Sequence, residues 1–245
     1  MPSLRPFFTY YGGKWRAAPR YPSPIYERLV EPFAGSAGYA VRHHERLVEL
    51  RDLDPVIIGL WRYLIAVKSS EVRRLPLVFD DVRNLSIPQE AKWLIGFWLN
   101  KGMTSPCNIP GKWMRDNDAS RLETYWGAAV RDRIATQVEK IRHWRATLGS
   151  YDEVSTSLPA TWYVDPPYRS ESGRRYRSSE IDYAHLSRWC KALKGQVMVC
   201  EQQGADWLPF KPYMAIKTTE GKYGKSRSHE ALWTNGGPDT LFPRA

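Results

Sequence analysis

The chain has few cysteines and few histidines, and each shortage excludes a class of protein. Its 245 residues hold 3 cysteines, an odd number without CxxC spacing, which excludes a disulfide framework and indicates a reducing compartment. None of the 5 histidines has metal-ligand spacing to a cysteine or to another histidine. We therefore expect no metal site, and we expect Cys190 and Cys200 to be core thiols.

The sequence also lacks a long apolar run. The longest one, Val56 to Val67, is interrupted by Arg62 and is shorter than the roughly 20 residues that a membrane helix needs. The first residues reach Phe7 and Phe8 without the apolar region of a signal peptide. No internal repeat or low-complexity segment is present, which excludes solenoid and disordered classes. We expect no membrane partner and a cytoplasmic protein, in a bacterium or in the host of a phage that encodes it.

Positive charge is what the chain has in excess. Lys and Arg number 36 against 26 Asp and Glu, which gives a formal net charge of +10 and suits a polyanionic partner. Hydrophobic residues make up 42% of the chain, enough for a sizeable core.

Strand and helix signals alternate up to residue 67, with a helix expected from Pro55 to Val67. Residues 69–150 then become mainly helical, with helices expected at Gln89–Leu99 and Ala119–Leu148. Later strands are expected at 161–164, 196–200 and 230–234, with a helix at 179–193. The pattern predicts an α/β fold: a Rossmann-like sheet domain, flanked by helices and built from residues 1–68 and 151–245, with a mainly helical insertion at 69–150.

The tetrapeptide Asp165-Pro166-Pro167-Tyr168 directly follows the strand expected at 161–164. An exocyclic amine on a base is a poor nucleophile, so its methylation needs acceptors for both N–H groups and a surface that holds the base flat. Asp165 and a proline carbonyl are two such acceptors, and Tyr168 is a stacking surface. The alternative is a stiff turn, because proline fixes φ and removes donors.

A strand over Arg28–Phe33 leads into a glycine turn at Ala34–Gly38 and a helix that continues toward His44. Gly35 and Gly38 let the backbone approach a ligand, and the free N–H groups at the helix start favour an anionic group. The alternative is a simple connection between two elements.

A second strand ends at Asp52, about twenty residues after the first, where open α/β sheets place a carboxylate for ribose hydroxyls. Asp54 precedes Pro55, which is an ordinary helix start. We therefore favour Asp52 for ribose binding and Asp54 for capping.

Four blocks, in order, resemble the Dam-like adenine-N6 DNA methyltransferases, which use S-adenosylmethionine (SAM). Tyr10–Lys14 is similar to the family's N-terminal aromatic-x-Gly-Gly-Lys motif. Val30–Gly38 resembles its SAM loop Pro-Phe-x-Gly-x-Gly, with Ala37 where the second glycine often stands. Asp52–Asp54 resembles its Asp-Ile-Asn motif, and Asp165–Tyr168 resembles its catalytic block.

Two weaker matches extend the resemblance over most of the chain. Asn108–Trp113 is similar to the Phe-Asn-x-Pro-x-Gly segment of the family's target-recognition region, although Cys107 replaces the aromatic residue. Glu230–Asn235 resembles the late strand that ends in Thr-Asn in many members.

The resemblance implies direct methyl transfer from SAM to N6 of an adenine flipped out of double-stranded DNA, without a metal. Asp165 and the Pro166 carbonyl would accept the two N6 hydrogen bonds, and Lys14 would pair with the SAM carboxylate or bridge to Asp165. The implied catalytic residues are Asp165, Pro166, Pro167 and Tyr168. The implied cofactor-binding residues are Tyr10, Lys14, Pro32, Phe33, Gly35, Ser36, Gly38, Asp52 and Asp165.

In the resembled family, the insertion recognises the DNA target. Its loop from Asn100 to Arg115 combines amide, basic and aromatic side chains suited to base edges and phosphates, and a solvated connection is the alternative. A second basic segment follows the tetrapeptide and suits a phosphate clamp. The expected DNA-binding residues are Lys101, Asn108, Lys112, Arg115, Arg174 and Arg175.

Several alternatives stay open. The acceptor is an adenine in DNA, a cytosine N4 or an RNA adenine, or the chain is a DNA-binding relative without turnover. The recognition sequence is GATC, the family's habitual target, or another site. We expect a monomer or weak dimer, acting alone or with a restriction partner.

Overall fold

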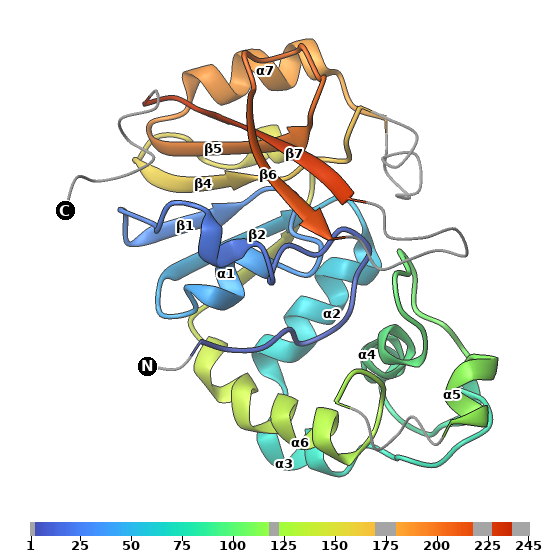
Figure 1. Cartoon of the computed structure of the whole chain (residues 1–245). Coiled ribbons are helices and arrows are strands. Elements are labelled where there is room, and N and C mark those ends of the chain that lie inside the picture. Colours follow the sequence, from blue (N-terminus) through green and yellow to red (C-terminus); the bar gives the residue numbers. More distant parts are fainter. Residues whose placement is uncertain (1–2, 118–122, 170–179, 218–226, 237–245) are drawn as a thin grey trace.

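A seven-stranded mixed sheet forms the centre of the computed structural model, which describes residues 3–117, 123–169, 180–217 and 227–236 (Figure 1). The strand order is β3-β2-β1-β4-β5-β7-β6. The strands are β1 (Arg28–Glu31), β2 (Leu47–Asp52), β3 (Arg145–Leu148), β4 (Ala160–Val164), β5 (Gly195–Gln202), β6 (Lys211–Lys217) and β7 (Arg227–Thr234).

The first five strands are parallel, in the order 3-2-1-4-5 that doubly wound α/β proteins share. β7 runs antiparallel between β5 and β6 and ends the sheet with a hairpin. The chain turns from one half of the sheet to the other between β1 and β4, so the connections after these strands diverge there. The fold is α/β and compatible with a Rossmann-like fold, and ligands of such sheets bind in the crevice at this switch point.

Helices cover both faces of the sheet (Figure 1). The α-helices are α1 (Gly38–Arg42), α2 (Pro55–Ala66), α3 (Ser69–Arg73), α4 (Gln89–Leu99), α5 (Lys112–Asp116), α6 (Ala128–Gln137) and α7 (Tyr183–Ala192). The expected helices at Pro55–Val67 and Gln89–Leu99 are confirmed, the first to within one residue. Among the described residues, no helix is both long and apolar enough to cross a lipid bilayer.

The two faces of the sheet bury separate hydrophobic clusters, because side chains alternate along a strand. On β5, Met198 and Cys200 face the larger cluster, and Val197 and Val199 face the smaller one under α7. Cys190 on α7 lies in the smaller cluster, so Cys190 and Cys200 are both buried thiols as expected.

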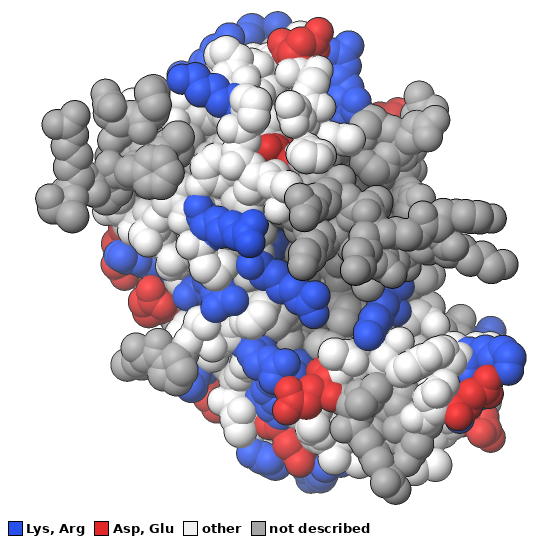
Figure 2. Space-filling model, in the orientation of Figure 1, with Lys and Arg blue, Asp and Glu red and all other residues white. Residues whose placement is uncertain are grey.

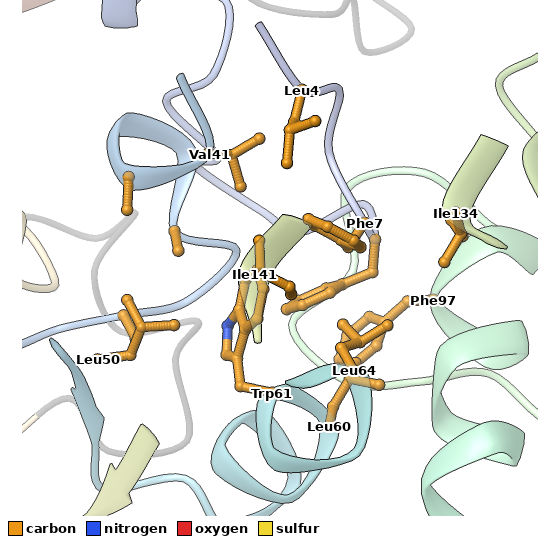
Figure 3. Packing of buried hydrophobic residues seen from close by; sticks show 14 of the residues in the cluster. Leu4, Phe7, Val41, Leu50, Leu60, Trp61, Leu64, Phe97, Ile134 and Ile141 are labelled. Carbon is orange, nitrogen blue, oxygen red and sulfur yellow. The ribbon is translucent and has the colours of Figure 1, made fainter. Parts of the chain in front are cut away.

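The larger cluster extends without a break into the helices between β2 and β3. Phe7 of the N-terminal segment, Trp61 of α2, Phe97 of α4 and Ile134 of α6 point into one core, and each is fully buried (Figure 3). The Trp98 indole donates to the Phe7 carbonyl at 2.9 Å. The N-terminal segment therefore joins these helices to the sheet.

The helix expected over Ala119–Leu148 is wrong in part. Within its described residues, α6 covers only Ala128–Gln137, and a 3-10 turn follows at Val138–Ile141. Arg145–Leu148 is strand β3, which pairs in parallel with β2 and belongs to the sheet, although the expected insertion at 69–150 counted it with the helices. We call the described part of residues 69–141 the helical region.

Candidate active site

One cleft lies at the carboxyl ends of β1, β2 and β4 and encloses about 1000 Å³, part of it open to solvent. It is lined by the chain segments 10–14, 31–38, 52–54 and 149–151, by Tyr163, Asp165 and Pro167, and by the segment 180–182. Every residue that the sequence assigned to a cofactor lines this one cleft: Tyr10, Lys14, Pro32, Phe33, Gly35, Ser36, Gly38, Asp52 and Asp165.

The loop after β1 adopts a conformation that suits small residues. Gly35 has φ +43°, and Ala37 has φ 47° and ψ 47°, a left-handed conformation that costs a residue with a Cβ. At Gly38, a Cβ would lie 2.4 Å from the backbone nitrogen of Trp15. Gly38 thus lets the backbone of the Lys14 segment pack directly against the start of α1.

Asp52, at the end of β2, fixes this loop from the side. Its Oδ2 accepts from the Gly35 N–H at 3.0 Å, and its Oδ1 accepts from the Asp54 N–H at 2.9 Å. Burial raises the pKa of Asp52 to about 6, against the two hydrogen bonds, which lower it. Its carboxylate on the cleft wall is therefore more basic than that of an exposed aspartate.

Asp54 has a different task. Its side chain accepts from the Val56 N–H at 2.8 Å and caps α2, as the sequence predicts. The Trp61 indole of the same helix donates to the Gly35 carbonyl at 2.9 Å, so α2 also holds the glycine loop.

Lys14 bridges the N-terminal motif to the tetrapeptide. Its Nζ donates to both carboxylate oxygens of Asp165, at 2.7 and 2.9 Å, and 8% and 19% of the two side chains are exposed. Burial lowers the pKa of Lys14. The surrounding acidic groups, Asp165 first, raise it by more, so that the net pKa lies well above its ordinary value. Two roles were expected for Lys14, and this geometry corresponds to the bridge to Asp165.

Burial raises the pKa of Asp165, and the Lys14 ammonium opposes the rise. The two prolines that follow differ in their carbonyls. The Pro167 carbonyl accepts from the Tyr183 hydroxyl at 2.7 Å. Within the described part of the chain, the Pro166 carbonyl accepts no hydrogen bond. The role of the Pro166 carbonyl as the second acceptor of an amino group therefore stays a prediction.

Tyr168 is half-buried beside the cleft. Its ring lies under the Lys14 ammonium, 4.8 Å from Nζ to the ring centroid, and its hydroxyl donates to Glu230 at 3.2 Å. Pro166 and Tyr168 do not themselves line the cleft, whereas Asp165 and Pro167 do.

Two residues of the cleft, Glu31 and Tyr151, and one residue near the tetrapeptide, Glu230, were not predicted as site residues from the sequence. Glu31, at the end of β1, is buried, and burial raises its pKa to about 8. The hydrogen bond that its carboxylate accepts from the Ala40 N–H acts in the opposite direction and lowers the pKa. Phe33 and Tyr151 stack with their ring centroids 5.3 Å apart. Tyr151 follows β3, so failure to predict that strand also concealed its place in the site.

The third residue, Glu230, lies on β7, at the start of the strand expected at 230–234. Glu230 is 5% exposed. No sequence signal marks it as buried, because only the pairing of β7 with β5 brings it to Lys14.

The described residues expected to bind DNA do not line the cleft: Lys101 and Asn108 lie in the loop from α4 to α5, and Lys112 and Arg115 lie on α5. Lys101, Asn108, Lys112 and Arg115 are all exposed there. Lys112 pairs with Asp116 at 2.6 Å, and Arg115 donates to the Pro110 carbonyl. Arg174 and Arg175 lie outside the described residues.

The same surface carries an aromatic pair. Trp113 is 51% exposed and stacks on Tyr125, with ring centroids 5.2 Å apart. The Lys101 ammonium lies 4.7 Å from the centroid of the Tyr125 ring. We call Lys101, Trp113 and Tyr125 the aromatic surface.

A backbone hydrogen bond links this loop to the cleft: Tyr11 N–H donates to the Met103 carbonyl at 3.0 Å. Tyr11 lines the cleft. Lys and Arg side chains predominate across the middle of the face in Figure 2, and the carboxyl ends of the parallel strands point to the same side of the molecule as α4 and α5 (Figure 1).

The described residues contain no group of three or more His, Cys, Asp or Glu side chains placed to hold a metal ion. Comparison of the chain with protein-family models and with curated proteins finds no match.

Proposed function

We propose that the chain is a SAM-dependent DNA methyltransferase that modifies N6 of an adenine flipped out of double-stranded DNA. One observation carries the proposal: four motifs far apart in the sequence, from Tyr10 to Asp165, line one cleft at the switch point of the sheet. A chance set of motif matches has no reason to converge on one site.

The chemistry of the cleft fits SAM. Asp52 offers a carboxylate of the kind that binds ribose hydroxyls at the end of the second strand. The raised pKa of Glu31 means that this carboxyl is largely protonated below pH 8, and an approaching cation favours its ionised form. SAM carries two cationic groups, a sulfonium and an ammonium, and when bound it supplies an electrophilic methyl group.

The tetrapeptide fits an amino-group acceptor. Asp165 and the unused Pro166 carbonyl would accept one N–H each, which directs the nitrogen lone pair away from the base plane. A carboxylate has further lone pairs while Lys14 is bound, so Asp165 can serve both partners. Tyr168 would stack on the flipped base.

The helical region fits a role in DNA binding. Lys101 in the loop after α4 lies beside the aromatic pair of Trp113 on α5 and Tyr125. Of these two rings Trp113 is the exposed one, and an exposed aromatic ring near a cation is what an unstacked base binds. The net charge of +10 favours a polyanion. A finer division into a catalytic domain and a target-recognition domain is part of this proposal.

Isotope-labelled SAM and unmethylated duplex DNA test the proposal, with labelled nucleosides identified by mass spectrometry. We expect labelled N6-methyladenine from the wild type and none from Asp165→Asn, which keeps the shape but replaces an acceptor oxygen by a donor. Asp152→Asn, an exposed carboxylate outside the cleft, is the matched control and should retain activity.

Each other product has a defined meaning. Labelled N4-methylcytosine would identify cytosine N4 as the acceptor instead of adenine N6, and label in RNA only would identify an RNA acceptor. SAM binding without any transfer to nucleic acid would identify a DNA-binding relative that has lost turnover. Activity of Asp165→Asn close to that of the wild type would refute the assigned role of Asp165.

A further inference from the structure

Glu230 brings a second carboxylate to the tetrapeptide. It lies on β7, where it pairs with Gln202 of β5 and with Met214 of β6, and 6% of its side chain is exposed. A carboxylate so far from water is costly unless charged or polar partners compensate it.

Its three partners come from two distant parts of the chain, the N-terminal segment and the tetrapeptide. Oε1 lies 3.6 Å from the Lys14 Nζ and accepts from the Tyr168 hydroxyl at 3.2 Å. Oε2 accepts from the hydroxyl of Tyr21, a buried residue just after the N-terminal motif. One oxygen therefore faces the site, and the other holds the side chain in place.

Both partners of Oε1 act on the proposed chemistry. Lys14 donates to Asp165, and the Tyr168 ring is the proposed stacking surface. A tyrosine ring turns freely about its side-chain bonds unless packing or its hydroxyl fixes it. The Glu230 carboxylate fixes that hydroxyl and draws the Lys14 ammonium toward the space between Asp165 and Tyr168.

We infer that Glu230 is a positioning residue for methyl transfer, which sets the Tyr168 ring and the Lys14 ammonium around Asp165 without touching the base itself. This inference rests on the proposed function. A purely structural role, in which Glu230 only satisfies buried hydroxyl groups, is the competing explanation.

The pH profile of the rate separates the effect of the Glu230 charge from its positioning role. Asp165 accepts an amino hydrogen bond best as a carboxylate, so its protonation sets the acidic limb of the rate profile. Burial raises the pKa of Asp165, Lys14 lowers it, and Glu230 raises it. The other titratable groups coupled to Asp165 are Tyr168, Cys200, Tyr163, Tyr21, Glu31 and Glu201.

Replacing Glu230 by Gln removes a negative charge while keeping the size of the side chain. The pKa of Asp165 should then fall, and the acidic limb of the rate profile should move to lower pH. That shift reports the charge of Glu230, whereas the rate lost on the plateau above the acidic limb reports its positioning role.

The test uses single-turnover methyl transfer to duplex DNA at saturating SAM, over pH 5 to 9. We expect Glu230→Gln to slow transfer at least tenfold at pH 8, to shift the acidic limb downward, and to change the Kd for SAM less than about threefold. Tyr168→Phe removes the hydroxyl that Oε1 accepts, and it should be slowed at least fivefold.

A double-mutant cycle gives the decisive comparison. If Glu230 acts through the Tyr168 hydroxyl, the loss of rate in the double variant Glu230→Gln, Tyr168→Phe should be smaller than the product of the losses in the two single variants. Tyr21→Phe, which loses only the contact to Oε2, should stay within threefold of the wild type.

A folded Glu230→Gln variant with a rate within twofold of the wild type and an unmoved acidic limb would overturn the inference. If that variant does not fold by circular dichroism, Tyr168→Phe decides alone, and a rate within twofold of the wild type would overturn the inference in that case. The wild type is the internal reference. Absence of transfer by the wild type would refute the proposed function. Transfer by the wild type together with an unaffected variant would refute only the role of Glu230.

Discussion

The Lys14 ammonium contacts both carboxylate oxygens of Asp165, at 2.7 and 2.9 Å, across 151 positions of sequence. The contact ties the N-terminal segment to the end of β4. It also sets the charge balance of the site, because the Glu230 carboxylate lies 3.6 Å from the same ammonium.

Replacing Lys14 by Met should destabilise the fold by roughly 3–5 kcal/mol, because it leaves two buried carboxylates without their cation. The pKa of Asp165 should rise further, since Lys14 now lowers it. An acid whose folded-state pKa is raised loses stability as pH rises above its ordinary value of 3.8. The gap in unfolding free energy between the wild type and the variant should therefore widen from pH 5 to pH 8 in urea titrations. A constant gap would contradict the ion pair.

Asp52 should make SAM binding depend on pH. Its pKa of about 6 means that the carboxylate becomes protonated, and a poorer acceptor, as pH falls below that value. We expect the Kd for SAM to increase from pH 7 to pH 5 in calorimetric titrations. Asp52→Asn should bind more weakly at pH 7 and show no such pH dependence. A variant with the pH profile of the wild type would assign the titration to another group.

Gly38→Ala tests the close approach of the Lys14 segment to α1. The added Cβ would lie 2.4 Å from the Trp15 nitrogen, so the segment must shift, at a cost of roughly 1–3 kcal/mol. SAM affinity should fall together with stability. The matched control is Gly59→Ala on α2, whose Cβ meets the ring of Trp93 at 2.8 Å, away from the cleft. The control should change thermal stability but leave the Kd for SAM within about twofold.

Ala37→Gly should stabilise the protein. Ala37 holds a left-handed backbone conformation, at a cost that exceeds the extra chain entropy of glycine by up to about 1 kcal/mol. For a chain of this size, that corresponds to an increase in Tm of roughly 2–4 °C in a calorimetric scan. A lower Tm would show that the Cβ of Ala37, which is 1% exposed, contributes more by packing than it costs.

The aromatic surface should contribute to DNA affinity in two separable ways. Lys101→Ala should reduce the slope of log K against log salt by about 1, as expected for one lost phosphate contact. Trp113→Ala should weaken binding with the slope unchanged, because stacking releases no counterions. Lys191→Ala, an exposed cation on α7, is the control. Equal salt slopes for all three variants and the wild type would exclude a phosphate contact at Lys101.

Elements with a strong local pattern were predictable from the sequence. The helix Gln89–Leu99 matches its expected bounds, because an apolar stripe and a preceding proline define it locally. The strand before the tetrapeptide is also local, since all five of its residues are buried and apolar or β-branched.

Edge strands were missed for a physical reason. β3 lies at one edge of the sheet, Arg145 is exposed and Leu148 is 44% exposed, so the strand shows no alternation of apolar and polar residues. β6 lies at the other edge, begins with Lys211 and Pro212, and carries a register shift. Only pairing with distant strands identifies either element.

The site divides in the same way. The motif residues of the cleft could be named in advance because each sits in a short conspicuous pattern, such as the glycine turn that holds Gly35. Glu230 could not, because its neighbours Ala231 and Leu232 read as an ordinary strand and its partners lie in the first and third quarters of the chain.

The hydrogen bond from Tyr11 to the Met103 carbonyl joins the lip of the cleft to the loop after α4. A ligand that orders one side of this bond lowers the entropy cost of ordering the other side. Occupancy of the cleft and occupancy of the loop should then be coupled, and thermodynamic reciprocity makes the two couplings equal in size. A single peptide unit would thus couple the proposed cofactor site to the loop that is proposed to bind DNA.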